Sequence, residues 1–286
     1  MLSDSVSEII NSIHAQLCYQ IFITPIPLPI EKEYRDFAKK ACEFFNANRS
    51  SSIVIEKPRH HVIHHFKQPT NPHAKKILVL HGWMSRAAYM ARLIRALHQQ
   101  GYEVFALDFP AHGEAKGIQL PWTEAVKVLQ QTLNHLGPFY GVIGHSFGGS
   151  MLLNLLTLAS QFPQWCLHAE PERVVLMASP TRMRIPVSKL ARRFKLNSKG
   201  FLFLRELFQH PSMKDLRHLD FRHYIKNANT PILCIHGEND ATIPPSESII
   251  LCQKYPYASL ALLPEVDHVS VLIDERVEKT ICHFLG

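Results

Sequence analysis

The sequence predicts an α/β protein: a mostly parallel sheet flanked by helices, with a small helical cap insertion. Two observations lead to this prediction. From Lys75 onward, short runs of almost only apolar residues alternate with amphipathic segments at helical spacing. Runs without polar alternation are typical of strands buried on both faces, as in a parallel sheet covered by helices. A basic segment, residues 181–228, interrupts the alternation once.

Residues 1–70 precede the alternation and are predicted to form an N-terminal helical extension and a leading strand pair. Apolar residues recur at helical spacing over 3–16 and 31–48, on either side of the extended proline run TPIPLPI. The stretches SSIVIE and HVIHHFK then predict two strands.

Residues 71–180 and 229–286 are predicted to form the core. The first range contains the strands KKILVLHG, EVFALDF, FYGVIGH and ERVVLMAS, and the second contains PILCIHG and ASLALLPE. Glycine and proline support the boundaries of the intervening helices: Gly101 ends one, while Pro121 starts and Gly137 ends the next. The last helix is expected to run unbroken through VSVLIDERVEKTICHFL.

The interrupting segment is predicted to be a basic helical cap. It contains twelve Lys and Arg residues against three Asp and Glu, although the whole chain carries only +7. Apolar positions at helical spacing, Leu190 with Phe194 and Leu204 with Leu207 and Phe208, predict amphipathic helices. Such a cap would roof an acyl pocket while its cations attract anionic substrates or lipid surfaces. A merely solvated basic face is an equally good interpretation.

Composition limits the expected partners and location. Clustered cations can indicate nucleic-acid binding, but the aromatic pattern of a stacking platform is missing, so no nucleic acid is expected. The N-terminus is acidic, and the apolar stretch 21–30 contains three prolines, so neither a secretory signal nor a transmembrane segment is expected. Six scattered cysteines without a CxxC pair favour a cytoplasmic location. The oligomeric state is open.

The motif GHSFG lies between a predicted strand and a predicted helix. In this context G-x-S-x-G is typical of a tight turn that presents a nucleophilic serine, here Ser146. Gly144 and Gly148 keep side chains away from the turn, and the helix start favours negative charge. A glycine-rich packing turn is the alternative, but the strand-to-helix context favours the nucleophile.

A serine nucleophile needs a base, and the base needs an acid that orients it. The loop GENDATIP after one strand contains Asp240, and the loop PEVDHVS after the last strand contains His268. Both loops follow the carboxyl ends of strands, where the catalytic groups of parallel sheets gather. Glu238 and Asp267 are rival acids. Asp240 is predicted, because the side chain of Asp267, adjacent in sequence to His268, is poorly placed to reach its ring.

The backbone N–H groups of Trp83 and Phe147 are predicted to form an oxyanion hole. Trp83 lies in the loop LHGWMS after the first strong strand, where Gly82 lets the chain pass close to the nucleophile. Phe147 directly follows Ser146. The Trp83 ring is also expected to serve as a core aromatic.

Other signals are weaker. The histidines of RHHVIHHF invite a zinc interpretation, but strand alternation sends neighbours to opposite faces, and no Cys or carboxylate accompanies them. A solvated strand or edge is predicted instead, containing His60, His61, His64 and His65. Arg86 and His112 are expected to have turn roles, although either could contact substrate. No P-loop or GxGxxG motif occurs, so no cofactor is expected, and no metal site is expected.

Five motifs in order, HGW, DFPAHG, GHSFGG, GENDATIPP and VDH, resemble those of the α/β-hydrolase superfamily, in particular bacterial single-domain members. The resemblance covers about residues 74–180 and 229–286. It implies the α/β-hydrolase fold and a serine hydrolase with Ser146, Asp240 and His268 as the catalytic triad. Relatives that attack haloalkanes or epoxides carry Asp at the nucleophile position, so Ser146 argues against those reactions.

The sequence therefore predicts cleavage of a carboxylic ester or thioester, in the manner of a carboxylesterase or lipase. Ser146 would attack the carbonyl and form an acyl-enzyme, with His268 as base and Asp240 orienting it. The substrate is expected to be a small acyl ester, anionic or lipid-like. The alternative is a receptor-like module of the same fold that binds a ligand without catalysis, for which a complete triad has no use.

Overall fold

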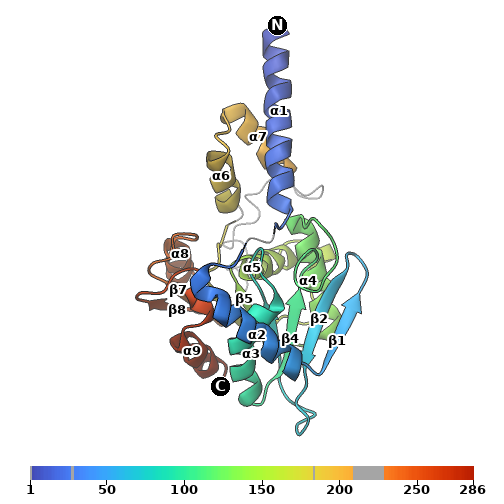
Figure 1. The fold of residues 1–286 in the computed structure, drawn as a ribbon, viewed down its shortest axis with the longest axis vertical. Helices are drawn as coiled ribbons and strands as arrows, with labels where there is room; N and C mark the ends of the chain where they lie inside the picture. The colour runs from blue at the N-terminus through green and yellow to red at the C-terminus, as the bar shows by residue number, and fades with distance from the viewer. Residues whose placement is uncertain (1, 27–28, 183, 209–228) are drawn as a thin grey trace.

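An eight-stranded sheet runs through the computed structural model, which describes residues 2–26, 29–182, 184–208 and 229–286 (Figure 1). The strands are β1 (Ser51–Ile55), β2 (His61–Phe66), β3 (Lys76–Leu80), β4 (Glu103–Asp108), β5 (Gly141–His145), β6 (Arg173–Met177), β7 (Ile232–Gly237) and β8 (Ala258–Leu263). Their order across the sheet is β1-β2-β4-β3-β5-β6-β7-β8. β1 and β2 are antiparallel to their neighbours. The other six strands, β3 to β8, are parallel to one another. The predicted mostly parallel sheet is confirmed.

Two layers of helices cover the sheet. Leu78 and Leu80 of β3 pack against one layer, and Ile77 and Val79 against the other, each at most 1% exposed. Burial on both faces is the reason these strands are apolar throughout. The first layer contains α4 (Trp122–Leu136), α5 (Phe147–Ala159), the 3-10 turn η3 (Pro163–Trp165) and α8 (Ser246–Lys254). The second contains α2 (Arg35–Asn48), the 3-10 turn η2 (Ala87–Met90), α3 (Ala91–Gln99) and α9 (Glu275–Leu285).

The first helix is longer than predicted. α1 (Leu2–Ile23) continues past the expected end at Gln16. The additional turns carry Tyr19 and Phe22, whose rings each lie 5.1 Å from the ring of Phe208. Aromatic packing with a distant part of the chain thus stabilises a segment whose local sequence has little helical pattern.

Two other expected helices are divided by short 3-10 turns. The segment after β8 forms η5 (Ser270–Leu272) and then α9, because Asp274 begins a new helix by accepting a hydrogen bond from the Arg276 N–H at 2.8 Å. The helix expected over 31–48 likewise starts as η1 (Lys32–Tyr34) before α2.

The leading strand pair belongs to the sheet of the core. β2 pairs with β1 on one side and with β4 on the other, where Val62 lies opposite Asp108. The prediction that the histidines occupy a solvated strand or edge is therefore wrong for β2, in which His61 and His64 are fully buried. His61 Nδ1 lies 2.7 Å from the Arg59 carbonyl, and His64 Nε2 lies 3.0 Å from Asp108 Oδ2. His65 Nε2 lies 2.6 Å from Glu103 Oε1. The local pattern could not show that strands would flank β2 on both sides.

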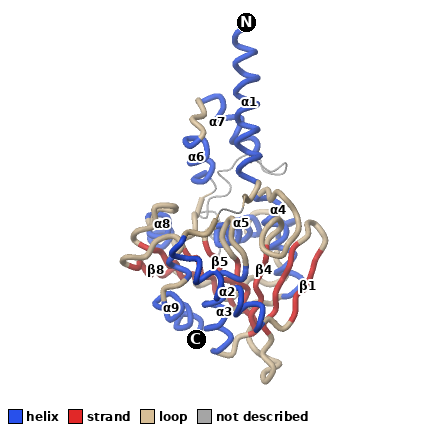
Figure 2. Tube along the Cα trace, viewed as in Figure 1, coloured by secondary structure: helices blue, strands red, loops and turns tan. Residues whose placement is uncertain are grey.

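Within the residues that the structure describes, three helices form a cap beyond the carboxyl ends of the parallel strands: α1, α6 (Arg184–Arg193) and α7 (Ser198–Leu207) (Figures 1 and 2). The apolar positions predicted for the insertion face inward, with Leu190, Leu204 and Phe208 at most 8% exposed. α1 lies alongside α7 with its start at the tip of the cap, while the C-terminus lies on the opposite side of the body. Residues 209–228 of the predicted cap lie outside the described residues. Across the described ranges, no helix is long and apolar enough to cross a membrane.

Candidate active site

Ser146 occupies the turn between β5 and α5, with φ 49° and ψ −111°. This left-handed backbone costs a residue with a side chain about 1–3 kcal/mol and is typical of functional turns. The flanking glycines make the turn possible: a Cβ on Gly144 would lie 2.4 Å from the Gly149 backbone, and one on Gly148 would lie 2.7 Å from the His81 carbonyl. The Ser146 N–H donates to the Met177 carbonyl at 2.8 Å, which ties the turn to β6. The strain is therefore held by neighbouring structure.

Three side chains from different strand ends form one hydrogen-bonded chain. His268 Nδ1 lies 2.7 Å from Asp240 Oδ2, and His268 Nε2 lies 3.0 Å from Ser146 Oγ. Because a carboxylate only accepts, the imidazole proton belongs on Nδ1. Nε2 is then free to accept the hydrogen bond of the Ser146 hydroxyl. The loops after β5, β7 and β8 thus bring the three predicted residues together at the carboxyl edge of the sheet.

The carboxylate of Asp240 is buried, and hydrogen bonds from protein groups take the place of water around it. Its Oδ1 accepts hydrogen bonds from the N–H groups of Thr242 at 2.8 Å and Ile243 at 2.7 Å. His236 Nε2 lies 3.3 Å from Oδ2. Burial raises the pKa of Asp240, but the hydrogen bonds from His236, His268 and Ile243 lower it more, so the pKa lies well below its ordinary value. The carboxylate is ionised at neutral pH and can fix the His268 tautomer.

The two rival acids have other surroundings. Glu238 is exposed to solvent. Asp267 Oδ1 accepts from the N–H groups of Val269 and Ser270, each at 2.7 Å, and its Oδ2 accepts from the Tyr34 hydroxyl at 3.1 Å. The carboxylate of Asp267 therefore organises its own turn and anchors the segment before α2.

The loop after β3 passes directly beside the nucleophile turn. A Cβ on Gly82 would lie 2.8 Å from His145 Nδ1 and 3.4 Å from the Cβ of Ser146, so only glycine allows this approach. The backbone of Trp83 follows at once. Phe147 is the first residue of α5, where helical N–H groups have no intrahelical acceptor. Within the described chain, the N–H groups of Trp83 and Phe147 donate to no other protein group.

His112 supports this loop rather than pointing into a pocket. Its Nε2 accepts a hydrogen bond from the Met84 N–H at 3.2 Å, and its Nδ1 donates to the Pro110 carbonyl at 2.9 Å. Its ring packs edge-on against Trp83 at 4.9 Å. Burial lowers the pKa of His112 to about 3, so the ring stays neutral and able to accept. Arg86, in contrast, is exposed.

Asp108 braces the same loop, and sequence reasoning assigned it no role. Its Oδ1 accepts from the Ala87 N–H at 2.7 Å, and its Oδ2 accepts from the Glu114 N–H at 2.8 Å and from His64 Nε2 at 3.0 Å. One buried carboxylate thus joins β2 to the loops after β3 and β4. The motif DFPAHG was the available signal, because a carboxylate directly after a buried strand needs nearby donors.

His145 was also missed as a positioning residue. Its Nε2 lies 3.0 Å from the His268 carbonyl, to which it donates. Burial, and then the nearby His268, lower the pKa of His145 to about 3. The neutral ring of His145 therefore holds the backbone of the loop that carries His268. The motif G-x-S-x-G accepts any residue before the serine, so the sequence did not indicate this contact of His145.

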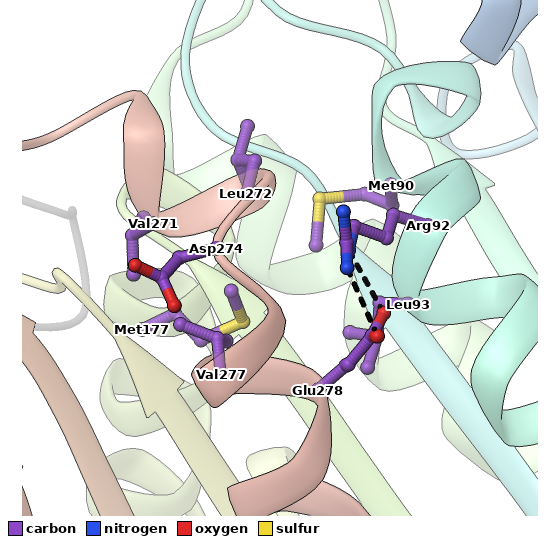
Figure 3. A pocket seen from close by; sticks show the side chains of 9 residues that line it. All are labelled: Met90, Arg92, Leu93, Met177, Val271, Leu272, Asp274, Val277 and Glu278. Atoms are coloured by element: carbon purple, nitrogen blue, oxygen red, sulfur yellow. Dashed lines mark hydrogen bonds and ion pairs between the residues drawn. The ribbon is translucent and has the colours of Figure 1, made fainter. Parts of the chain in front are cut away.

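A small cavity between α3 and α9 is separate from the hydrogen-bonded chain (Figure 3). Its volume is about 10 Å³, which accommodates about one water molecule. Arg92 and Glu278 close one side through hydrogen bonds of 2.9 and 3.1 Å, and neither Ser146 nor His268 lines it. This cavity is a packing gap of the second helix layer.

Two groups of known proteins resemble this chain in sequence. The pimeloyl-[acyl-carrier protein] methyl ester esterase of Nitrosospira multiformis is 24% identical over 68% of this chain and 88% of that protein. The enzyme of the same name from Nitrosomonas europaea is 23% identical over 71% of this chain and 92% of that protein. The acetyltransferase component of the acetoin-cleaving system of Pseudomonas putida is 28% identical over 64% of this chain and 56% of that protein.

Solved structures share the fold at low sequence identity. An esterase of Pyrococcus furiosus has a TM-score of 0.62 at 20% identity, covering 92% of this chain and 96% of that one. A putative lipase of Acinetobacter baumannii has a TM-score of 0.61 at 17% identity, covering 90% and 97%. The family model described as "Alpha/beta hydrolase family" matches residues 77–280. This match covers well over half of the chain and includes Ser146, Asp240 and His268. The protein therefore belongs to the alpha/beta hydrolase family.

Proposed function

We propose that the protein hydrolyses a carboxylic ester or thioester through an acyl-enzyme on Ser146. The observation that carries this proposal is the continuous chain from Ser146 Oγ through His268 to Asp240, at 3.0 and 2.7 Å. A group that only bound a ligand would not need an ionised, buried carboxylate aligned on a histidine that in turn accepts from a serine. Esterases among the relatives support the same reaction class.

The geometry supplies each proton transfer. Ser146 Oγ attacks the carbonyl carbon while His268 Nε2 takes its proton, and Asp240 stabilises the imidazolium that forms. The tetrahedral oxyanion accepts hydrogen bonds from the N–H groups of Trp83 and Phe147. His268 then gives the proton to the departing alcohol or thiol. A water molecule repeats the sequence on the acyl-enzyme and releases the carboxylic acid.

The cap favours an acyl ester that carries negative charge. Four cations of α6 and the turn after it are exposed: Lys189, Arg192, Arg193 and Lys195. The relatives from Nitrosospira multiformis and Nitrosomonas europaea are named as esterases of an acyl-[acyl-carrier protein] methyl ester, which is likewise an acyl ester. We place the reaction in the cytoplasm, because the scattered cysteines suit a reducing compartment.

A fluorophosphonate probe tests the nucleophile directly. The wild-type protein should be labelled at Ser146, and Ser146→Ala should abolish labelling and lower kcat for p-nitrophenyl and CoA esters by about 10³- to 10⁶-fold. Ser160→Ala is the matched control, since Ser160 ends the same helix and its hydroxyl bonds only locally, to the Thr157 carbonyl. An unlabelled wild-type protein, or a Ser146→Ala variant with near-native turnover, would favour the ligand-binding alternative.

A further inference from the structure

α1 has two apolar faces, and the described part of the fold covers only one of them. The covered face packs against the rest of the cap and the loop after β3. Ala15 and Cys18 are fully buried there, and Phe22 stacks on Trp83 with ring centroids 6.0 Å apart. The other face is exposed and consists of aliphatic side chains that are 40–63% accessible: Val6, Ile9, Ile10, Ile13, Leu17 and Ile21. We call this second face the α1 stripe.

The α1 stripe is continuous and uncharged. Its members are spaced by one, three or four residues, which places them on one side of a helix. The acidic residue beside them in sequence, Glu8, points elsewhere and pairs with Lys199 of α7 at 3.4 Å. α1 stands out from the body of the molecule, so the stripe lies at the end of the protein that carries the cap (Figure 1). Contiguous aliphatic surface of this kind marks an interaction site rather than ordinary surface composition.

The charge of the neighbouring helices limits the occupant. From 184 to 208 the cap contains seven Lys and Arg residues against the single acid Glu206. Two copies that met through the α1 stripe would bring these like-charged segments together, which disfavours a second copy of the chain. An occupant with an apolar interior and an anionic exterior satisfies both features.

The composition of the stripe favours a lipid over a protein. Protein interfaces are enriched in aromatic, Met and Arg anchors. The α1 stripe contains only Val, Ile and Leu, and it has no hydrogen-bonding group to pair with a partner. Helices that lie in a bilayer interface combine an apolar face with nearby cations, which are attracted to anionic headgroups.

We propose that α1 docks the protein on an anionic phospholipid surface. The α1 stripe enters the boundary between headgroups and acyl chains, and exposed cations of α6, α7 and the turn between them contact the phosphates: Arg192, Arg193, Lys195 and Arg205. The opposite face of α1 stays packed on α7, so the helix lies on the surface rather than crossing it. The stacking of Phe22 on Trp83 joins the docked helix to the candidate oxyanion loop. Docking itself requires no turnover and stands apart from the proposed reaction.

Vesicle flotation of the full-length protein tests the proposal. We expect binding to vesicles of phosphatidylcholine with phosphatidylglycerol and at least about tenfold weaker binding to phosphatidylcholine alone. Ile10→Glu with Ile13→Glu should lower binding to the anionic vesicles by at least about tenfold. Ser12→Glu with Gln16→Glu adds the same charge at exposed positions of α1 outside the stripe, and should retain most of the binding. Ile10→Ser with Ile13→Ser provides a milder stripe variant, and circular dichroism reports whether each variant is folded.

Four results would overturn docking on lipid. The wild-type protein could stay unbound on anionic vesicles, or the stripe and control variants could bind equally. Alternatively, sedimentation could show a dimer that the stripe variants dissociate, in the absence of vesicle binding, which would assign the stripe to a second copy. Binding to an acidic protein without vesicle binding would assign it to a protein partner. Ester hydrolysis by the same samples, measured on a soluble substrate, separates failure of docking from failure of the proposed function.

Discussion

The carboxyl edge of the sheet and the cap differ in how far their side chains are paired within the chain. At the edge, the buried carboxylates are matched closely with hydrogen-bond donors: Asp240 and Asp108 each accept hydrogen bonds on both carboxylate oxygens. In the cap, α1 presents more apolar surface than the fold covers, and the basic helices beside it carry cations in excess over acids. Matching of polar groups holds atoms in one geometry, which suits chemistry. Unmatched surface suits contact with something outside the chain.

Among the changes that test this comparison, the largest effect should come from removing the charge of Asp240. Asp240→Asn replaces the carboxylate with an amide that can favour the wrong tautomer of His268, and kcat should fall on the order of 10³- to 10⁴-fold. Asp267→Asn, one residue from the same histidine, should change kcat by less than about tenfold, because that carboxylate contacts Tyr34 and its own turn. Steady-state kinetics on a p-nitrophenyl ester measures both. If Asp267→Asn proved the more damaging change, the acid would be misassigned.

This contrast also marks what the sequence can predict. Ser146, Asp240 and His268 each lie within five residues of a strand end, and parallel strands bring their ends together whatever the rest of the chain does. Motif and strand position were therefore enough to nominate them. The same holds for Gly82, which follows β3 closely and approaches the nucleophile turn.

Contacts between segments that are far apart in the chain could not be predicted from the sequence. Nothing in the local pattern pairs Phe22 with Trp83 or with Phe208, yet these aromatic contacts extend α1 and place it in the cap. The burial of His64 depends likewise on β1 and β4 flanking β2, which strand alternation alone does not reveal. Such contacts are set by tertiary packing, which overrides local propensity.

The buried histidines behind the edge should make the fold sensitive to acid. Burial lowers the pKa of His112 and of His145 to about 3, whereas an unfolded histidine titrates at ~6.5. Between these values the unfolded chain binds protons that the folded chain does not, so the free energy of unfolding falls as the pH falls. Each histidine should contribute a slope of about 1.4 kcal/mol per pH unit below ~6.5. The pKa of Asp240 is lowered in the folded protein, so the stability that Asp240 contributes is lost only as the pH falls below the ordinary pKa of an aspartate, ~4.

Urea unfolding between about pH 7 and about pH 5 measures this slope. His112→Gln removes one titrating group, while its amide oxygen can still accept from the Met84 N–H. The slope of the free energy of unfolding against pH should therefore be smaller in the variant by the contribution of one histidine, about 1.4 kcal/mol per pH unit. An unchanged pH dependence in His112→Gln would mean that His112 is protonated in the folded protein, contrary to its burial and hydrogen bonding.

The smallest effect should come from the charge of the cap. Exposed cations raise the local concentration of anionic substrates, and screening by salt removes the advantage over a Debye length of about 8–10 Å. Reversing Arg192, Arg193 and Lys195 to Glu should lower kcat/KM for an anionic acyl ester by about three- to tenfold. A neutral ester of equal chain length serves as the internal control and should be almost unaffected, because none of the three side chains belongs to the hydrogen-bonded chain at Ser146. Added salt should reduce the preference of the wild-type protein for the anionic ester and leave the reversed variant nearly unchanged. If both esters respond alike to the reversal and to salt, the cations of the cap do not select substrate, and the lipid surface is the remaining role for them.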